Sequence, residues 1–431
     1  MCYLIPGPIH NQLLFQMLLK HLNQLISSIG AMNRSLNTNY QPFNAPSSEI
    51  LSGKTILITG ASGFLGSRLA EVLIKEYGCT VYALIRNFSK AIKISHLKVH
   101  YIYGDLADTT WVSQLPPSLD FVFHCAYGSS GNSQDREKTD VNGTRNLVHA
   151  VSSRGVQKIV FMGTISIYKL KASGVINENS TIKPIDQYGR NKYRAEKEFI
   201  KQCKQLNLRY TILRPSAIIG AGAPFYVDAI LDAIKTTRVV FLEKGEGLLN
   251  WVFLDDVILV MINSLHNRNS DNKGFIVNHT QPVSYWQYYN CLAAIIQEEM
   301  MYEFLSKEKN IKLQRKAIRD IWPILLNSIN INRDELRKLL AYKSFSSGYA
   351  LFRKVLVRFS PKNQVKTSTL PPPSDRPLSF VAPAYVGLIS SKVYYDSREL
   401  REAKLLNQFT GIEKAMDTIR KHHAWEQEWK I

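Results

Sequence analysis

The sequence predicts an α/β fold built on a doubly wound parallel sheet, with a smaller region towards the C-terminal end. Three observations carry this prediction. An apolar run at Thr55–Thr59 leads into glycines spaced three apart (Gly60, Gly63 and Gly66), and amphipathic sequence follows. Further apolar runs then alternate with helical patterns, as in parallel sheets with helical crossovers. With 431 residues, 45% of them apolar, the chain can also bury a large core.

The glycine triplet lies where a strand, a tight turn and a helix start meet, which is the context of a dinucleotide-binding loop. Gly60 allows the turn, Gly63 lets backbone N–H groups approach a pyrophosphate, and Gly66 lets the helix pack close to the strand. Loops before helices also carry glycine for turn geometry alone, but here strand and helix both lie where binding requires them. The residues expected to line the cofactor at this loop are Gly60, Ser62, Gly63, Phe64, Leu65 and Gly66.

Four more strands are expected downstream, with a helical stretch at Asp140–Val148 among them. These strands are Thr80–Ile85, Val99–Tyr103, Asp120–Ala126 and Lys158–Met162. They predict a Rossmann-type domain over residues 51–220, a substrate-binding region over 221–431 and an N-terminal extension and linker over 1–50.

The residue after the second strand indicates the preferred dinucleotide. The end of this strand meets the adenosine ribose, where an acidic residue favours the free 2′-hydroxyl and an arginine favours the 2′-phosphate. Arg86, with Lys90 nearby, therefore favours NADP(H) over NAD(H). The alternative is an exposed arginine at a strand end that touches no ligand.

Tyr188 and Lys192 lie four residues apart, so on a helix they share one face. A lysine placed there lowers the pKa of the tyrosine and can also donate to a ribose hydroxyl. Such a tyrosine can pass a proton to or from a carbinol oxygen during hydride transfer. Tyr193 and Lys197 repeat the spacing, so the spacing alone does not identify the pair.

The order of the motifs along the chain resembles the extended short-chain dehydrogenase/reductase family, also called the NAD-dependent epimerase/dehydratase family. The family pattern is T-G-x-x-G-x-x-G, an acidic residue after the third strand, N-x-x-G-T on a helix, a Ser or Thr shortly before V-Y, and then Y-x-x-x-K. This chain supplies Thr59–Gly66, Asp105, Val141–Thr144, Thr164 before Tyr168, and Tyr188 with Lys192. The helix motif is the loosest match, because Asn142 stands directly before Gly143.

The resemblance implies a role for each matching residue. Tyr188 is expected to be the general acid/base, Lys192 to bind the nicotinamide ribose, and Thr164 to hydrogen-bond the substrate oxygen. Asn142 is expected to stabilise the junction between sheet and helix. The remaining cofactor contacts expected are Asp105 and Leu106 beside the adenine, and Ala126 and Pro215.

The implied function is an NAD(P)-dependent oxidoreductase that interconverts a secondary alcohol and a ketone. Nucleotide-sugar enzymes of the family often grip the diphosphate with an arginine just before the segment matched by Trp251–Val257, and Glu246–Trp251 contains none. Apolar residues there, such as Leu248, Leu249 and Phe253, favour a hydrophobic small-molecule substrate.

Two alternatives remain. The first is a nucleotide-sugar epimerase or dehydratase, although Ile165 and Ser166 stand where dehydratases usually carry an acidic pair. The second is a non-catalytic NADPH-binding sensor or scaffold, against which the intact Thr164, Tyr188 and Lys192 argue.

About half of the net charge of +19 lies in an insertion at about 300–375. Residues 301–380 hold about 16 Lys and Arg against about 6 Asp and Glu, interleaved with apolar residues. This pattern is typical of a lid over the substrate pocket or of peripheral contact with a membrane, and partner binding is a third alternative. There is no nucleic-acid-binding motif.

The five scattered cysteines indicate a reducing compartment and a cytoplasmic protein, and they argue against a zinc site. The segment Leu13–Ile29 is too polar to span a bilayer and is expected to form an amphipathic helix. A homodimer through the helices near residues 140 and 190 would be usual for the family.

Overall fold

The computed structural model describes residues 48–128, 137–313, 378–379, 381 and 383–428. The amphipathic helix expected at Leu13–Ile29 and most of the basic insertion lie outside these residues. Among the helices that the structure describes, none combines the length and the apolar character needed to cross a membrane.

A parallel sheet of seven strands forms the larger part of the fold, which confirms the predicted fold class. From one edge to the other the order is β3-β2-β1-β4-β5-β7-β12, so the chain doubles back at β1 as in dinucleotide-binding folds. The strands are β1 (Thr55–Thr59), β2 (Thr80–Ile85), β3 (Val99–Tyr103), β4 (Phe121–His124), β5 (Lys158–Met162), β7 (Tyr210–Pro215) and β12 (Lys273–Val277). The last strand comes from beyond residue 220.

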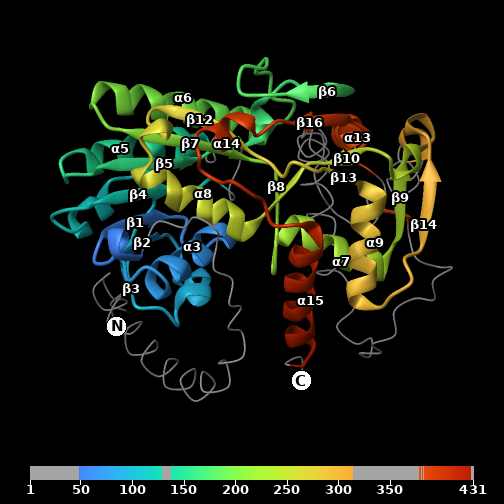
Figure 1. Ribbon diagram of the computed structural model, residues 1–431, viewed down its shortest axis with the longest axis horizontal. Helices are drawn as coiled ribbons and strands as arrows, with labels where there is room; N and C mark the ends of the chain where they lie inside the picture. The colour runs from blue at the N-terminus through green and yellow to red at the C-terminus, as the bar shows by residue number, and fades with distance from the viewer. Residues whose placement is uncertain (1–47, 129–136, 314–377, 380, 382, 429–431) are drawn as a thin grey trace, which may run out of the picture.

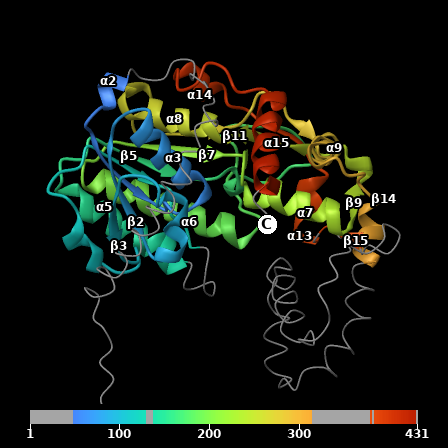
Figure 2. The same ribbon diagram turned by 90° about the horizontal axis from the view of Figure 1, so that it is seen from below.

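Helices cover both faces of this sheet, and Figure 2 shows the two layers. Side chains of a strand alternate between faces, so Ile56 and Ile58 of β1 join one buried cluster while Leu57 joins the other. Helices α3 (Phe64–Lys75) and α8 (Leu254–His266) pack on the first face. Helices α5 (Gly143–Ser152) and α6 (Gln187–Gln205) pack on the second.

The helices form where apolar residues recur every three or four positions. In α6, Ala195, Phe199 and Cys203 lie one turn apart and are buried, while the residues between them are mostly charged. The stretch expected at Asp140–Val148 begins instead as the π-helix η4 (Lys138–Asn142) and continues as α5. A π-helical turn widens the backbone and often marks a functional position.

A smaller region lies beside the seven-stranded sheet, on the right of Figure 1. It is built from helices and a three-stranded parallel sheet of order β14-β9-β15 around its own apolar cluster. Its main elements are the π-helix η6 (Pro224–Asp228), α7 (Ala229–Thr236), β9 (Arg238–Leu242), α9 (Tyr285–Ile296), β14 (Tyr302–Leu305), β15 (Leu378–Ser379), α13 (Pro383–Ile389) and α15 (Ile412–Glu428).

Short parallel pairs join the two regions. Strand β8 pairs with β11, and β6 pairs with β16, so the chain crosses between the regions several times. These elements are β6 (Ser173–Ile176), β8 (Ala217–Ile219), β11 (Trp251–Phe253), β16 (Lys392–Tyr395) and α14 (Arg398–Glu402). The remaining short elements are α2 (Ser48–Leu51), η2 (Phe88–Ile94), η3 (Thr110–Gln114), η5 (Ile165–Ile167), η7 (Glu243–Gly245), β10 (Leu248–Leu249), η8 (Arg268–Ser270) and β13 (Val283–Ser284).

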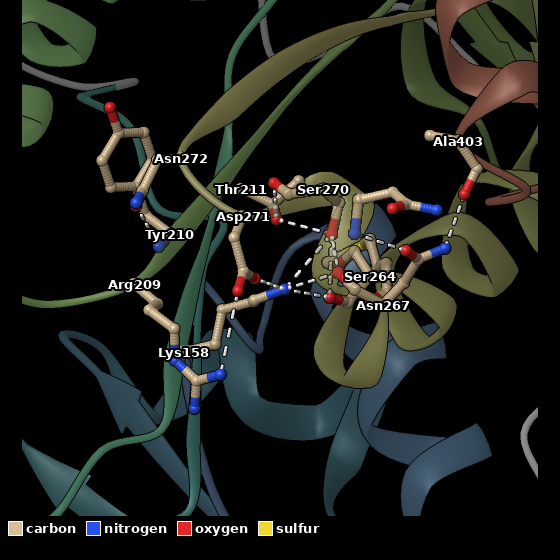
Figure 3. Close-up of polar contacts among 12 residues, drawn as sticks. Lys158, Arg209, Tyr210, Thr211, Ser264, Asn267, Ser270, Asp271, Asn272 and Ala403 are labelled. Carbon is tan, nitrogen blue, oxygen red and sulfur yellow. Dashed lines mark hydrogen bonds and ion pairs between the residues drawn. The ribbon is translucent and has the colours of Figure 1, made fainter.

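A buried lysine ties the amino end of the sheet to helix α8 (Figure 3). Lys158 opens β5, and its side chain is 1% exposed. Its ammonium donates to the carbonyls of Ser264 and Asn267 at 2.7 and 3.0 Å and to the Ser270 hydroxyl at 3.2 Å, and it is ion-paired with Asp271. The positive charge thus lies at the carboxyl end of α8, where unpaired carbonyls and the helix dipole favour a cation.

The carboxyl group of Glu178 is expected to make the free energy of unfolding depend on pH. Its carboxylate accepts the N–H of Ile276 in β12 at 2.7 Å, but burial raises its pKa from 4.5 to about 7. The folded protein therefore binds this proton more tightly than the unfolded chain does. We expect this contribution to the free energy of unfolding to be full below about pH 4.5 and lost as the pH rises through about 7.

Chemical unfolding of wild type and Glu178→Gln between pH 4 and 8 (roughly the span of the expected transition) measures this effect. The variant should lack the part of the decline that wild type shows. Glu402→Gln, which changes an exposed carboxyl, is the control and should keep the wild-type slope. Parallel pH profiles for wild type and Glu178→Gln would contradict the assignment.

Candidate active site

The carboxyl edge of the parallel sheet gathers the residues predicted from the sequence. Because all seven strands run the same way, the residues that follow each strand meet at this edge. The glycine loop follows β1, Arg86 follows β2, Asp105 and Leu106 follow β3, Ala126 follows β4, Thr164 follows β5, and Pro215 ends β7.

The glycine loop has the geometry that a bound pyrophosphate requires. Gly60 has a φ of +73°, and a β-carbon there would lie 2.8 Å from the Ala126 nitrogen, so glycine is needed for both the turn and the close approach. Gly63, at the N-terminus of α3, is exposed, and no side chain caps the helix. The first N–H groups of α3 are thus available to an anion. The residues present fit a dinucleotide phosphate.

The two residues expected near the adenosine are paired with each other. The Arg86 guanidinium lies 3.3 Å from the Asp105 carboxylate, and their side chains are 41% and 31% exposed. A pair this exposed contributes little to stability, so the guanidinium can exchange this partner for a ligand phosphate. The Asp105 carboxylate also accepts the N–H of Ala107 at 2.9 Å, which shapes the turn after β3.

Helix α6 brings Tyr188 and Lys192 to the end of β5. Asp186 caps its start by accepting the N–H of Gly189 at 2.7 Å. A β-carbon on Gly189 would lie 2.4 Å from the Ser166 carbonyl oxygen, so only glycine lets the helix approach the loop that carries Thr164. The lysine ammonium donates to the carbonyl of Met162, the last residue of β5, at 2.5 Å.

Tyr188 lies close to Thr164, whose hydroxyl accepts the N–H of Ser166 at 3.2 Å. Desolvation is the main influence on the Tyr188 hydroxyl and raises its pKa above the ordinary value, whereas the nearby Thr164 hydroxyl lowers it. The pKa therefore moves opposite to the direction expected from Lys192, and Tyr188 holds its proton at neutral pH.

Lys192 is 4% exposed, and burial lowers its pKa. Three groups act in the other direction, with Asp140 the largest, followed by Cys125 and Glu196. The chain thus surrounds the ammonium with groups that favour its charged form. Of the predicted catalytic residues, the structure brings Thr164, Tyr188 and Lys192 together.

Two neighbours of this group were not among the residues predicted from the sequence. The Tyr127 ring packs edge-on against the Tyr188 ring with centroids 5.9 Å apart, and the Lys192 ammonium lies 6.0 Å from its centroid. Asp140 is buried within η4. The motif spacing could have indicated it, because counting N-x-x-G-T back from Gly143 gives Asp140 rather than Asn142.

A chain of hydrogen bonds through His124 connects Thr59, the residue just before the glycine loop, with η4. The Thr144 hydroxyl donates to the Asp140 carbonyl at 2.5 Å and therefore accepts from His124 Nε2 at 2.9 Å. His124 Nδ1 then accepts from the Thr59 hydroxyl at 2.7 Å. Burial lowers the pKa of His124 to about 3, so the ring is neutral, as this single direction of donation requires.

Comparisons with known proteins agree with this geometry. The sequence pattern of the NAD dependent epimerase/dehydratase family matches residues 56–278, more than half of the chain. The sterol-4-alpha-carboxylate 3-dehydrogenase (decarboxylating) of Homo sapiens is 25% identical over 250 residues, 54% of this chain and 65% of that protein. Sterol demethylase protein B of Methylococcus capsulatus is 32% identical over 172 residues, 38% of this chain and 52% of that protein.

Among solved structures, the UDP-glucuronic acid 4-epimerase of Bacillus cereus, in complex with UDP-glucuronic acid and NAD, superposes with a TM-score of 0.53. It shares 23% identity and covers 58% of this chain and 86% of its own. At this identity the likeness concerns the fold.

The fold and the site define the class of protein: an NAD(P)-dependent enzyme of the extended short-chain dehydrogenase/reductase type. Within that class, the chain belongs to the NAD dependent epimerase/dehydratase family.

Proposed function

We propose that this protein is an NADP(H)-preferring oxidoreductase that interconverts a secondary alcohol and a ketone on a hydrophobic small molecule. The observation that carries the proposal is the meeting of Thr164, Tyr188 and Lys192 at the carboxyl edge of the sheet, the edge that also carries the uncapped N-terminus of α3. A protein that only binds the cofactor has no need of a phenol held next to a hydroxyl donor at that place.

Each residue has one task in this reaction. Bound nicotinamide supplies or accepts the hydride. Tyr188 gives its proton to the ketone oxygen in reduction and takes it back from the alcohol in oxidation. The Thr164 hydroxyl orients the same oxygen and stabilises its developing charge. Lys192 would hold the nicotinamide ribose, and the α3 N-terminus would hold the phosphates.

Exposed apolar side chains near Tyr188 support a hydrophobic substrate. Tyr127 contacts the Tyr188 ring, Tyr226 in η6 raises the pKa of the Tyr188 hydroxyl, and Ile185 precedes α6. These three residues and Phe225, which stands next to Tyr226, are each at least 37% exposed. Apolar surface of this extent around a polar reacting group is typical of sites for hydrophobic ligands. The sterol-processing names of the relatives from Homo sapiens and Methylococcus capsulatus agree with this substrate class.

Net consumption of cofactor separates this proposal from the epimerase alternative. An oxidoreductase consumes NADPH when an apolar ketone is added, whereas an epimerase returns its cofactor unchanged while it isomerises a nucleotide sugar. A panel of alicyclic ketones and UDP-hexoses, followed by nicotinamide absorbance and product analysis, makes the comparison. Isomerised UDP-hexose without net NADPH consumption would favour the epimerase.

The NADP(H) preference predicts the effect of Arg86→Ala. Loss of the guanidinium should weaken NADPH binding by about 1.5 to 3 kcal/mol, the range for a hydrogen bond to a charged group, and leave NADH binding unchanged. Tryptophan fluorescence quenching during cofactor titration measures both affinities. Lys93→Ala, which removes a nearby exposed lysine of η2, is the matched control. Equal losses for NADPH and NADH would overturn the preference.

Two properties of assembly are also proposed. The basic insertion at about 300–375 would contact a membrane surface peripherally, and a homodimer would form through the helices η4, α5 and α6. Salt-sensitive sedimentation with anionic vesicles and analytical ultracentrifugation test these two points.

A further inference from the structure

Arg214 connects helix α6 with the loop that carries Thr164. It lies on β7, beside β5, and only 9% of the residue is exposed. Its guanidinium donates through Nε and Nη2 to both carboxylate oxygens of Glu196, at 3.2 and 2.7 Å, and through Nη1 to the hydroxyl of Tyr168 at 2.8 Å. Glu196 and Tyr168 are each 2% exposed. A guanidinium holds its donors in a rigid planar fork, so these bonds fix the two partners relative to each other.

The loop that carries Thr164 meets Arg214 at both of its ends. At the first end, a β-carbon on Gly163 would lie 3.1 Å from Cγ of Arg214 and 3.0 Å from Oε2 of Glu196, so the loop rests directly against the ion pair. At the other end, Tyr168 follows η5 and accepts from Nη1. Thr164 lies between these two contacts, directly after Gly163.

Helix α6 meets the same guanidinium through Glu196. Tyr188, Lys192 and Glu196 follow one another at intervals of four residues, so they lie along one face of the helix. Glu196 is one turn beyond Lys192, whose ammonium donates to the carbonyl of Met162 at the end of β5. The helix face that carries the proposed general acid/base is therefore tied to Arg214.

Stability alone does not account for a charged pair at this position. A buried ion pair loses much of its attraction to the desolvation of both groups, and apolar residues of similar volume often stabilise a protein equally well. Apolar residues cannot, however, reproduce three directional hydrogen bonds from one planar group. The arrangement favours a role in positioning the elements that meet at the guanidinium.

We infer that Arg214, with Glu196 and Tyr168, is a positioning residue that fixes the Thr164 hydroxyl relative to Tyr188. Its effect on turnover rests on the proposed function, whereas its effect on the loop does not. With the three bonds in place, the hydroxyl that orients the substrate oxygen and the phenol that moves the proton are held towards the same oxygen.

Arg214→Lys keeps the positive charge but cannot make the three bonds at once. Because a displacement of about 1 Å can cost about a hundredfold in rate, we expect kcat for an apolar ketone to fall by about that factor. The affinity for NADPH should be kept. The rate is expressed per NADPH-binding site, counted by fluorescence titration, so that a loss of folded protein does not appear as a loss of kcat.

Arg154→Lys is the matched control. The Arg154 guanidinium also donates to several oxygens, the carbonyls of Val112, Leu115 and Pro116, but these residues precede β4, at the opposite edge of the sheet from Thr164. This variant should keep the wild-type kcat per site. Equal values of kcat per site in Arg214→Lys and Arg154→Lys would overturn the inference.

A double-variant cycle shows whether Arg214 acts through Thr164. If it does, Arg214→Lys combined with Thr164→Ala should lose about as much kcat as Thr164→Ala alone, because the hydroxyl to be positioned is already absent. A residue that only stabilises the fold would not show this dependence. Losses that multiply in the double variant would place the action of Arg214 elsewhere and contradict the inference.

Tyr168→Phe keeps the test decisive if Arg214→Lys folds poorly. It removes only the hydroxyl that accepts from Nη1 and leaves the bonds between Arg214 and Glu196 in place. The kcat per site should fall in the same direction, by less than in Arg214→Lys. A wild-type kcat in Tyr168→Phe would contradict the role of the loop contact.

Hydrogen–deuterium exchange of the full-length protein tests the loop without any substrate. The N–H groups of Gly163, Ser166 and Tyr168 are hydrogen-bonded within the fold, so they should exchange faster in Arg214→Lys and in Tyr168→Phe than in wild type, while the amides of α5 keep their rates. Unchanged exchange in the loop would overturn the inference. If the loop exchanges faster in the variants but wild type reduces no ketone, the proposed function fails and the positioning of the loop stands.

Discussion

Replacing Tyr188 by phenylalanine should abolish turnover while leaving cofactor binding intact. The substitution removes the hydroxyl that moves the proton and keeps the ring that packs against Tyr127. General acid/base catalysis typically contributes about one hundred- to ten-thousand-fold, and we expect kcat to fall by that factor. Steady-state kinetics with NADPH and an apolar ketone measure the loss, and fluorescence titration checks that NADPH affinity is kept.

Tyr193→Phe is the matched control for this experiment. Tyr193 and Lys197 repeat the four-residue spacing on the same helix, and Lys197 lies 5.0 Å from the Tyr193 ring. Tyr193 packs against the apolar cluster that includes Ile167, and Lys197 is exposed. We therefore expect Tyr193→Phe to keep near-normal kcat. A Tyr188→Phe variant that retains turnover would exclude Tyr188 as the general acid/base.

Replacing Lys158 by methionine should destabilise the folded protein by about 3 to 5 kcal/mol, the range for breaking a buried ion pair from one side. Methionine fills similar space but leaves Asp271 without its buried partner and removes one of the donors to the carbonyls of Ser264 and Asn267 (Figure 3). Denaturant unfolding measures the free energy. Because Lys158 lies at the opposite end of β5 from Thr164, the cofactor affinity of the folded variant should not change.

Lys54→Met is the control for Lys158→Met. Lys54 stands directly before β1, and its ion pair with Asp120 is 3.1 Å long, but the two side chains are 35% and 25% exposed. An exposed pair of this kind contributes about 0 to 1 kcal/mol. Similar losses in the two variants would show that burial of Lys158 does not decide its contribution.

The sequence predicts the parallel sheet well because its signal is local. Strands buried on both faces appear as short apolar runs, and the four expected downstream strands match β2, β3, β4 and β5 within three residues at each end. The glycine triplet is equally local, since turn, loop and helix start follow one another directly. Two strands of the sheet, β7 and β12, were not predicted, and elements of the smaller region separate β12 from β7 along the chain.

The electrostatics of the site could not be predicted in the same way. The pKa of Tyr188 depends on how many side chains from distant segments exclude water from its hydroxyl, and spacing says nothing about that. Asp140 was overlooked because Asn142 offered the residue type that the motif names, and only the position relative to Gly143 separates the two. The pairing of Arg86 with Asp105 could not be predicted either, because it joins the ends of β2 and β3, which become neighbours only in the folded sheet.

Transfer of label from the cofactor to a product tests the central claim most directly. NADPH carrying deuterium at the transferable position of nicotinamide C4 is incubated with the wild-type protein and an apolar ketone. The account predicts an alcohol that carries one deuterium on the carbinol carbon, formed in step with NADPH consumption and not formed by Tyr188→Phe. NADPH that binds tightly but never passes its deuterium to any ketone in the panel would contradict it.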